Sequence, residues 1–407
     1  MDSPFFYLIN NSMNIKENLF LGLVLSKNVV FKTKRWYQSL RSGDNKLTKH
    51  KAYNAVVPTH FTPMIDENRY DTRSTDFDKI ISQTHKHFWD PNDKKYIDFD
   101  VDFDMEKNYL VDPRVFCMEL QVPTIADKLT ENQKIKLANE SFGWVLSQIL
   151  HGEQGAMSLS ASLCHILKDP GAQEYAANQT REEARHVLAF HQYIKKRWGK
   201  VYKVGDTLGR VLDDVVSSGV VWKKIIGMQI LIEGLAMGAF SMAHADTKDP
   251  LLKKLLQLVM SDEAFHHKFG KIWADRTVPQ LNSSEHIKVE DWSEKIFLEL
   301  IFNLANPREK QDIYETVGLD WKWVLAESQK HFDLYETVRT EMKNPNNIFR
   351  VLVKTLLNAH IITKRTKKTY ANFVNMRELK DEGDEFKPAE EIAELGIKQL
   401  QKINKVA

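Results

Sequence analysis

The amino-acid sequence predicts an all-α protein built around a four-helix bundle. Two observations support this fold class: long segments in which apolar residues recur at helical spacing, and a pattern of Glu and His residues that occurs twice. The 407 residues are enough for one large helical domain with extensions. We expect an N-terminal extension and loop-rich segment over residues 1–131, the bundle over 132–281 and further helices over 282–407.

Each copy of the pattern is a lone Glu followed 30 positions later by Glu-x-x-His. The two copies contribute six residues: Glu153, Glu183, His186, Glu233, Glu263 and His266. Positions i and i+3 lie on one face of a helix, so the Glu and the His of each Glu-x-x-His can reach the same point. Each lone Glu lies in an apolar helical segment, where a buried carboxylate needs a partner.

A Glu from each of two helices and a Glu-x-x-His from each of two others form the ligand set of di-metal carboxylate bundles. Oxygen and imidazole ligands suit iron or manganese better than a metal that prefers thiolates. The sequence therefore predicts two iron ions, with a manganese–iron pair as the alternative and Glu183 and Glu263 as bridges. Apolar residues on the same helix faces disfavour the contrary interpretation, which is ordinary charged pairs on solvated faces.

An acidic residue precedes the Glu of each Glu-x-x-His: Glu182 in the first copy and Asp262 in the second. A metal-bound His usually donates its other ring N–H to a carboxylate. In an antiparallel bundle, we therefore expect Asp262 to hold His186 and Glu182 to hold His266.

This doubled acid-Glu-x-x-His pattern resembles the ferritin-like superfamily of carboxylate-bridged di-iron oxidases and oxygenases, which includes the ribonucleotide reductase small subunit. The resemblance covers about residues 132–277. It implies a bundle with one long crossover, the six residues as ligands, and O2 activation at the iron pair. Because the sequence has no flavin, nicotinamide or iron–sulfur motif, an external reductase or ferredoxin is the expected electron donor.

Departures from named members leave the member of the superfamily open. Phe190 stands where the reductase small subunit has its radical Tyr. Val259 stands where arylamine N-oxygenases add a His, and Met237 stands where several hydroxylases have a Thr. Oxidising equivalents are therefore expected to pass to a bound substrate and not to a stable tyrosyl radical.

The leading functional hypothesis is an O2-dependent oxidation of an organic, hydrophobic substrate, with hydroxylation, desaturation and N-oxygenation all open. The alternatives are a ferroxidase or iron-handling role, and a structural helical protein without metal. A cavity for O2 or substrate would be lined by four residues: Met157, Phe190, Met237 and Phe240. Core packing is an equally simple account of at least Phe190 and Met237. Small residues beside the lone glutamates fit either a cavity or close helix packing.

The expected bundle helices cover residues 132–167, 172–198, 220–245 and about 250–278, with a connecting helix over 206–218. Gly199 should end the second helix, and Asp249-Pro250 should open the fourth, which ends before Pro279. Further helices are expected over 289–304, 321–342, 348–373 and 389–403, and a short one over 76–86 capped by Ser74 or Thr75. The acidic, aromatic stretch before the bundle is expected to be a loop anchored on it; it lacks the Gly and the closing Glu of a calcium loop.

Composition limits the other possibilities. The net charge of +2 gives no argument for nucleic acid. The two cysteines, Cys117 and Cys164, are expected to be buried apolar residues in a reducing, cytoplasmic compartment. The apolar run Leu19–Ser26 is too short to span a bilayer, and neither a transmembrane segment nor a signal peptide is expected. The basic run 364–368 is expected to be a solvated helix face or a docking patch for an acidic electron donor, and a homodimer is possible.

Overall fold

The computed structural model describes residues 51–56, 59, 61–303, 306–344, 347–382 and 387–406. The chain divides into two units, Met1–Lys46 and Leu47–Ala407, and every described residue belongs to the second. The N-terminal arm and its apolar run Leu19–Ser26 lie outside the described residues. Within the described ranges the protein is helical, as predicted, and its isolated β-bridge joins Ala55 to Leu167.

Four long helical segments form the middle of the chain. They are α6 (Glu131–Ile166), α7 (Pro170–Trp198), the consecutive pieces α9 (Val221–Lys224), η7 (Ile225–Ile232) and α10 (Glu233–Asp246), and α11 (Pro250–Thr277). Helix α8 (Asp206–Val216) lies in the long connection between α7 and α9. These bounds agree with the predicted helices to within one or two residues.

Local sequence signals set the ends of these helices. Thr130 and Gln133 form a reciprocal capping box at the start of α6. Asp169 and Asp249 each cap a helix whose first residue is Pro. Gly199 ends α7 with a φ of 68°, the left-handed conformation that glycine adopts without a steric penalty.

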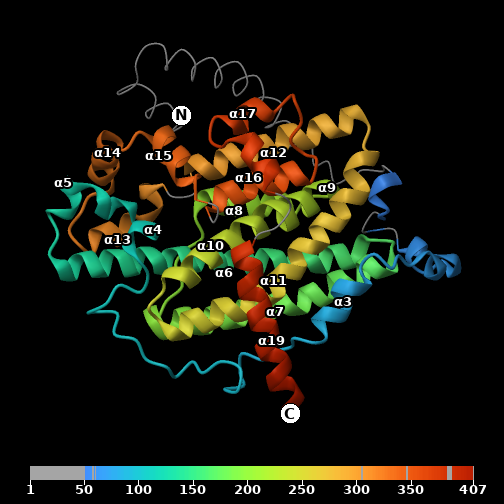
Figure 1. Ribbon diagram of the computed structural model, residues 1–407, viewed down its shortest axis with the longest axis horizontal. Helices are drawn as coiled ribbons and strands as arrows, with labels where there is room; N and C mark the ends of the chain where they lie inside the picture. Colours follow the sequence, from blue (N-terminus) through green and yellow to red (C-terminus); the bar gives the residue numbers. More distant parts are fainter. Residues whose placement is uncertain are drawn as a thin grey trace. The chain divides into compact units, whose positions relative to one another are not determined.

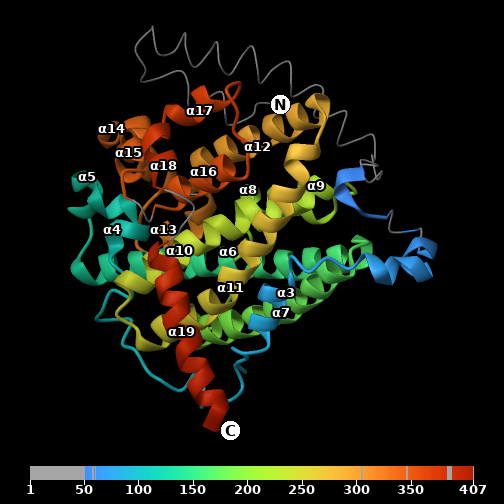
Figure 2. The same ribbon diagram turned by 45° about the vertical axis from the view of Figure 1, so that its right-hand side comes forward.

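The four segments pack as two hairpins. Helices α6 and α7 lie side by side along their lengths (Figures 1 and 2), and the short turn Leu167–Asp169 between them makes them antiparallel. A similarly short turn joins α10 to α11, and α11 also packs against α7. The connection that carries α8 joins the hairpins, and α8 packs against α6. Side chains directed inward from all four segments therefore meet between them.

The third segment differs from the predicted regular helix. Its middle piece, η7, is π-helical and ends at the residue before Glu233. Periodicity at 3.6 residues does not reveal such a local widening, which is often found at functional sites. Gly227 allows close packing here, since a Cβ at this position would lie 2.5 Å from Cγ2 of Val215.

Helix Val221–Asp246 is the one segment of the described residues that is long and apolar enough to cross a membrane by length and composition. Its most apolar window is 78% buried inside the structure. Such burial is typical of a core helix, which passes the same test, so this feature is weak evidence for membrane insertion.

The C-terminal region consists of many helices. They are η8 (Val278–Gln280), α12 (Ser283–Asn303), η9 (Pro307–Lys310), α13 (Gln311–Glu315), α14 (Trp321–His331), α15 (Leu334–Glu341), α16 (Ile348–Asn358), α17 (Lys367–Ala371), α18 (Met376–Asp381) and α19 (Lys387–Val406). The predicted helix 321–342 is wrong, because Asp333 caps a new helix by accepting from Glu336 N. The predicted helix 348–373 is also wrong: α16 ends at Asn358, and His360 follows with a φ of 57°.

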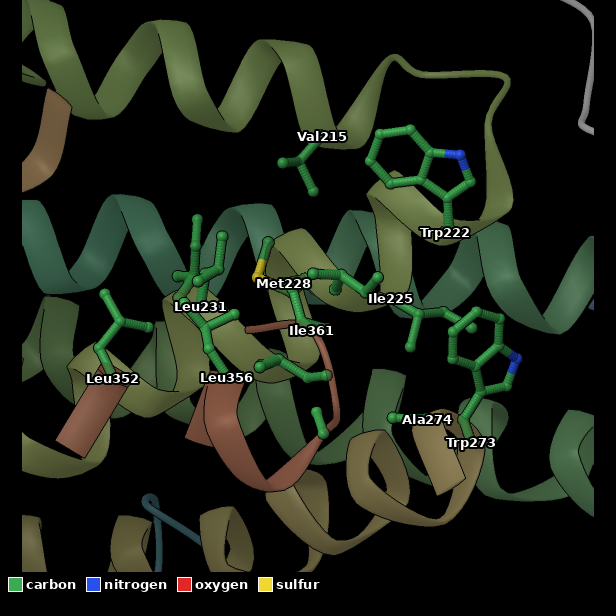
Figure 3. Close-up of a cluster of buried hydrophobic side chains, with 14 of the residues drawn as sticks. Val215, Trp222, Ile225, Met228, Leu231, Trp273, Ala274, Leu352, Leu356 and Ile361 are labelled. Carbon is green, nitrogen blue, oxygen red and sulfur yellow. The ribbon is translucent and has the colours of Figure 1, made fainter. Parts of the chain in front are cut away.

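A large apolar core joins this region to the bundle. Figure 3 shows Met228 and Leu231 from the third segment near Leu352 and Leu356 of α16, with Trp222 beside Val215 of α8 and Trp273 of α11 near Ile225. These side chains are 4% exposed or less, except Trp273 at 5%. Helix α16 thereby packs against both η7 and α10.

Helix α19 covers α11 in the same way. It crosses α11 (Figure 1), and the crossing is close because a Cβ on Gly396 would lie 2.2 Å from Oγ of Ser261. Asn404 near its end donates to the carbonyl of Phe88 and accepts from the hydroxyl of Tyr96. The last described helix therefore also holds the loop that precedes the bundle.

The segment before the bundle is mostly loop, as predicted. Its short helices are η3 (Lys51–Tyr53), η4 (Thr62–Met64), η5 (Glu67–Thr72), α3 (Asp78–Thr84), α4 (Pro113–Phe116), η6 (Met118–Gln121) and α5 (Pro123–Ala126). Trp89 and Tyr96 are buried and anchor the loop. The predicted cap of α3 is wrong: the capping position is Phe77, while Ser74 accepts from Asp76 N before the helix begins. Of the two cysteines, Cys117 is buried and Cys164 only half-buried.

Candidate metal centre

The six residues of the doubled pattern lie together between the four segments. Glu153 comes from α6, Glu183 and His186 from α7, Glu233 from the first turn of α10, and Glu263 and His266 from α11. All six side chains are buried, with at most 5% of any residue exposed. Residues 113 positions apart at the extremes are thus brought to one point by helix packing.

Donor atoms of these residues form two overlapping groups, in each of which all atoms lie within 4.8 Å of one another. The first group is Glu153, Glu183, His186 and Glu263, and the second is Glu183, Glu233, Glu263 and His266. Glu183 and Glu263 belong to both groups. The arrangement can therefore hold metal ions at two adjacent positions that share two carboxylates.

Both imidazole rings are oriented with Nδ1 toward the carboxylates. His186 Nδ1 lies 3.2 Å from Glu153 Oε2 and 3.0 Å from Glu263 Oε1. His266 Nδ1 lies 3.0 Å from both Glu183 Oε1 and Glu263 Oε2. Each Nδ1 is thus at a point where several carboxylate oxygens converge, which is the geometry a cation requires.

The opposite ring nitrogens point to the acidic residues that precede each Glu-x-x-His. His186 Nε2 is 2.8 Å from Asp262 Oδ2, and His266 Nε2 is 3.0 Å from Glu182 Oε2. These are the two pairs expected from the sequence. A carboxylate oxygen accepts a hydrogen bond from each Nε2–H, so Nδ1 is the ring nitrogen that can bind a metal once its own proton is displaced.

Asp262 also binds three groups that the sequence did not indicate. Its Oδ2 accepts from Trp89 Nε1 at 2.8 Å and from Arg185 Nη2 at 2.6 Å, and its Oδ1 lies 3.1 Å from His87 Nε2. Burial by itself raises the pKa of Asp262, but Arg185, the hydrogen bond from His186 and the nearby imidazole of His87 bring that pKa well below its usual range. Asp262 is therefore an ionised, fully buried acceptor.

His87, Glu182 and Asp262 form a third group close enough for a cation. The guanidinium of Arg185 already supplies positive charge there, 2.6 Å from Asp262 and 4.0 Å from Glu182. A third metal ion would compete with this side chain. The centre is therefore better described as having two metal positions.

Two buried glutamines contact the carboxylates of the second group. Gln179 Nε2 donates to Glu183 Oε1 at 3.0 Å and to Glu233 Oε1 at 3.3 Å. Gln229, in the π-helical piece η7, donates to Gln179 Oε1 at 3.0 Å. Both glutamines are fully buried, and no sequence motif pointed to them.

The four carboxylates are not equivalent in charge. Burial raises the pKa values of Glu153 and Glu233 well above the ordinary range, and the other carboxylates add to this effect. Burial also acts on Glu183 and Glu263, but His266 and His186 lower the pKa values of these two below the ordinary value. The two shared carboxylates are thus ionised, while the two lone glutamates favour protons until a cation replaces them.

Protonated His186 and His266 balance the negative charge of the two shared carboxylates in the metal-free protein. Burial lowers their pKa values, but the carboxylates around them outweigh this effect and raise both pKa values well above the ordinary range. Metal binding would displace these protons from Nδ1. The donor set, four carboxylates and two imidazoles with their outer nitrogens held, fits two divalent cations that prefer oxygen and nitrogen ligands.

A buried tyrosine lies near the centre. Tyr175 of α7 is close enough to His266 and Glu182 for their charges to act on its hydroxyl, and its ring stacks on Phe269 with centroids 4.8 Å apart. Burial raises its pKa well above the usual value, and its hydroxyl has no hydrogen-bond partner among the described residues. The position of Phe190 therefore did not exclude a tyrosine near the metals.

Three of the four predicted cavity residues lie together. Phe190 and Phe240 stack with centroids 5.7 Å apart, and Met237 belongs to the same buried cluster. Met157 is half-buried on α6, outside this cluster. A role of these residues toward O2 or substrate stays a prediction.

The small residues beside the lone glutamates serve different purposes. A Cβ on Gly155 would lie 2.7 Å from Leu212, and one on Gly238 would lie 2.7 Å from Ile348, so both permit close helix packing. A Cβ on Gly152 would meet no atom within 4 Å. A surface groove of about 620 Å³ lies elsewhere, at Val278 and His286, and none of the predicted site residues lines it.

Sequence reasoning found the residues that repeat at helical spacing and missed those that reach the centre from elsewhere. Trp89 and His87 come from the loop before the bundle, and Arg185 was hidden inside the Glu-x-x-His motif itself. One signal was available for the glutamines: Gln179 and Gln229 each lie four positions before a predicted ligand, on the same helix face.

Comparison of the chain with protein-family models, with curated proteins and with solved structures finds no match. The case for a function therefore depends on the side chains of the centre and on their arrangement.

Proposed function

We propose that the four segments form a ferritin-like four-helix bundle whose centre binds two iron ions and serves an O2-dependent oxidation of an organic substrate. The observation that carries this proposal is the repeated orientation of the two imidazoles. In both copies, Nδ1 faces the shared carboxylates and Nε2 is held by an outer carboxylate. One such ring is common in helical cores, whereas two around shared carboxylates indicate a metal pair.

Iron is the metal we favour, with a manganese–iron pair as the alternative. The donor atoms are carboxylate oxygens and imidazole nitrogens, and no cysteine is among the three described groups of candidate ligands. This set suits iron and manganese and is unlike the thiolate sites typical of structural zinc. When bound, a reduced iron pair supplies the binding and activation of O2.

The residues of the chain would hold, orient and shield the metals. Glu183 and Glu263 would bridge them, and Glu153 and Glu233 would each complete one position. Asp262 and Glu182 fix the ring orientation of the histidines, which would keep the ligands in place when the metals are absent. Full burial of both histidines would exclude water from the reaction.

The substrate class we favour is hydrophobic, because Phe190 of α7 packs with Met237 and Phe240 of α10, on two of the helices that carry candidate ligands. Hydroxylation is our first choice, and desaturation and N-oxygenation are alternatives. The length of the chain supports an enzyme over a ferroxidase or iron-handling protein, since α16 and α19 enclose the bundle. Electrons would come from an external reductase or ferredoxin.

Metal content after anaerobic loading with ferrous iron tests the centre. We expect about two iron ions per chain, and we expect a Glu183→Ala, Glu263→Ala double variant to lose both. A stoichiometry near zero, or one that the double variant keeps, would refute the metal centre. The Gln192→Leu variant, on the same helix but at its far end, serves as the control.

Oxygen consumption distinguishes the two functional alternatives. The loaded protein, supplied with a chemical reductant and a panel of apolar organic compounds, should consume O2 faster with at least one compound. Accumulation of ferric mineral with excess iron, without any dependence on organic compounds, would support the ferroxidase alternative instead.

A further inference from the structure

The doubled pattern is symmetric in its ligands but not in the residues that support them. Gln179 lies four positions before Glu183, and Gln229 lies four positions before Glu233. The helices of the other two glutamates have aliphatic residues at the equivalent positions. These are Val259, four positions before Glu263, and Ile149, four positions before Glu153. One side of the centre therefore has amide donors where the other has aliphatic side chains.

The amide of Gln179 joins two helices through one nitrogen. Its Nε2 donates to Glu183 of its own helix and to Glu233 of α10, both of which belong to the second donor group. A single amide that contacts both carboxylates fixes the direction in which their oxygens point. Gln179 therefore orients two ligands of the second group before metal binds.

Glu153 in the first group has a different environment. Among the described residues its hydrogen-bond partner is His186 Nδ1, at 3.2 Å. That nitrogen is the atom expected to bind the metal, so this contact must break when the position fills. Both groups give up contacts between Nδ1 and carboxylates on metal binding, but Glu233 keeps the amide of Gln179, whereas Glu153 gives up the contact described for it.

The orientation of Gln179 is itself fixed. Its Oε1 accepts from Gln229, which lies in the last turn of η7 before Glu233. Helix α11 approaches closely at this point, since a Cβ on Gly270 would lie 2.7 Å from Cβ and 3.0 Å from the carbonyl oxygen of Gln229. The backbone of Gln229 is thus packed closely against α11, and its side chain fixes the orientation of Gln179 through the hydrogen bond to Oε1.

We propose that Gln179 is a positioning residue that makes the two metal positions unequal. The position formed by Glu233 and His266 fills first and binds more tightly, and the position formed by Glu153 and His186 is the weaker, exchangeable one. This inference rests on the proposed metal centre and adds an order of filling to it. The weaker position is then the one where an exogenous ligand replaces a protein contact with least cost.

Titration of the metal-free full chain with Co²⁺ tests this order without any assay of activity. Visible absorption of Co²⁺ reports each bound ion, and calorimetry reports each affinity. Wild-type protein should bind two ions in two separate phases. Gln179→Leu should weaken the tighter phase by about 10–100-fold, the usual effect of losing an outer hydrogen bond to a ligand, and the weaker phase much less, because Glu233 belongs to the second group alone.

Two further variants distinguish a specific effect on metal binding from a general loss of folding. Gln229→Leu keeps the amide of Gln179 and removes its orientation, so it should weaken the same phase by a smaller factor. Gln192→Leu makes the same exchange on α7 away from the centre and should change neither phase. Thermal unfolding of each metal-free variant shows whether the fold is kept, and Gln179→Met, which preserves side-chain length, replaces Gln179→Leu if it is not.

Different outcomes would contradict the order of filling and the metal centre itself. Two ions bound with equal affinity in wild-type protein, or equal weakening of both phases in Gln179→Leu, would overturn the order of filling and leave the metal centre standing. Absence of Co²⁺ binding in every protein would overturn the metal centre, and the order of filling with it.

Discussion

The indole Nε1 of Trp89 donates a 2.8 Å hydrogen bond to Oδ2 of Asp262, and the ring of Trp89 lies nearly parallel to that of His186, at an interplanar angle of 18°. A loop residue is therefore in contact with both members of the carboxylate–imidazole pair that supports one metal position. This relationship makes the loop before the bundle part of the centre.

Replacing Trp89 by Phe should keep the stacked ring and remove the hydrogen bond. A hydrogen bond to a charged, buried acceptor contributes about 1.5–3 kcal/mol. We expect a loss of that size in the free energy of unfolding of the metal-free protein, measured in urea, together with weaker binding at the position of His186. Trp323→Phe, in a different apolar cluster, is the control. Wild-type stability and affinity in Trp89→Phe would contradict the role given to this contact.

A carboxylate that did no more than hold His186 could be removed without unfolding the protein. Asp262 does more, because it is also the ionic partner of the buried Arg185. Removing one member of a buried ion pair typically costs about 3–5 kcal/mol. Asp262→Ala should therefore show a much lower midpoint of chemical unfolding than wild-type protein. An unchanged midpoint would mean that Arg185 finds water or another acceptor.

Glu182→Gln is the milder test of an outer carboxylate. The amide oxygen still accepts from His266 Nε2, but the negative charge is lost. Metal affinity should fall by about 10–100-fold while the fold is kept. Calorimetric titration with Co²⁺ measures the affinity, and circular dichroism checks the fold. Wild-type affinity would show that only the acceptor at this position matters, and not its charge.

Metal binding should release protons, because the pKa values of Glu153, Glu233, His186 and His266 are all raised in the metal-free protein. Groups whose pKa is raised on folding stabilise the folded state at low pH and lose that contribution as the pH rises through the folded pKa. The metal-free protein should therefore be less stable at about pH 9 than at about pH 6, and bound metal should reduce this difference.

Calorimetry in buffers of different ionisation enthalpy counts the released protons directly. More than one proton per chain is expected near neutral pH. Release of none would mean that the four groups are already deprotonated without metal, against the electrostatics of the buried cluster.

Tyr175 should not hold a long-lived radical. Oxidation of a phenol at neutral pH requires an acceptor for its proton, and the hydroxyl of Tyr175 has no partner among the described residues. After ferrous loading and exposure to O2, electron paramagnetic resonance should show no persistent tyrosyl signal, and Tyr175→Phe should behave like wild-type protein. A stable signal that Tyr175→Phe abolishes would place the protein nearer the reductase-like branch.

The π-helical piece should be sensitive to added volume at Gly227. A Cβ there would meet Val215 at 2.5 Å and Trp292 at 2.9 Å, and overpacking of a core costs about 1–3 kcal/mol. Gly227→Ala should lower the midpoint of thermal unfolding. Gly152→Ala, where a Cβ meets nothing within 4 Å, should leave or raise it, because alanine favours helix by about 1 kcal/mol over glycine. Equal effects of the two substitutions would argue against tight packing around η7.

Periodicity at 3.6 residues explains what could be predicted. It places Glu183 beside His186 and Glu263 beside His266, and the shared spacing places Glu153 and Glu233 opposite them. The outer pair of Asp262 and His186 followed from antiparallel packing alone. These relationships are local, or repeat along the chain, so a single sequence contains them.

The missed features depend on contacts between distant segments. Trp89 reaches Asp262 across 173 positions, and nothing in the sequence near either residue marks the contact. The π-helical turns before Glu233 pack against α16 and, at Gly227, against Val215 of α8. The spacing of apolar residues there is that of an ordinary buried helix. The breaks at Asp333 and His360 arise because a local cap and a left-handed residue end helices whose apolar spacing continues.

Helix α19 has a consequence for the biosynthesis of the protein. It begins 110 residues after α11 ends, from Thr277 to Lys387, yet it packs on α11 beside Asp262 and holds the loop of Trp89 through Asn404. At about 5–20 residues per second, a ribosome needs roughly 5–20 s to add that stretch. During this interval the nascent chain lacks the helix that packs on α11 and the Asn404 contacts that hold the loop of Trp89. We expect metal ions to reach His186 and Asp262 most freely in that interval, before the loop of Trp89 is fixed in place.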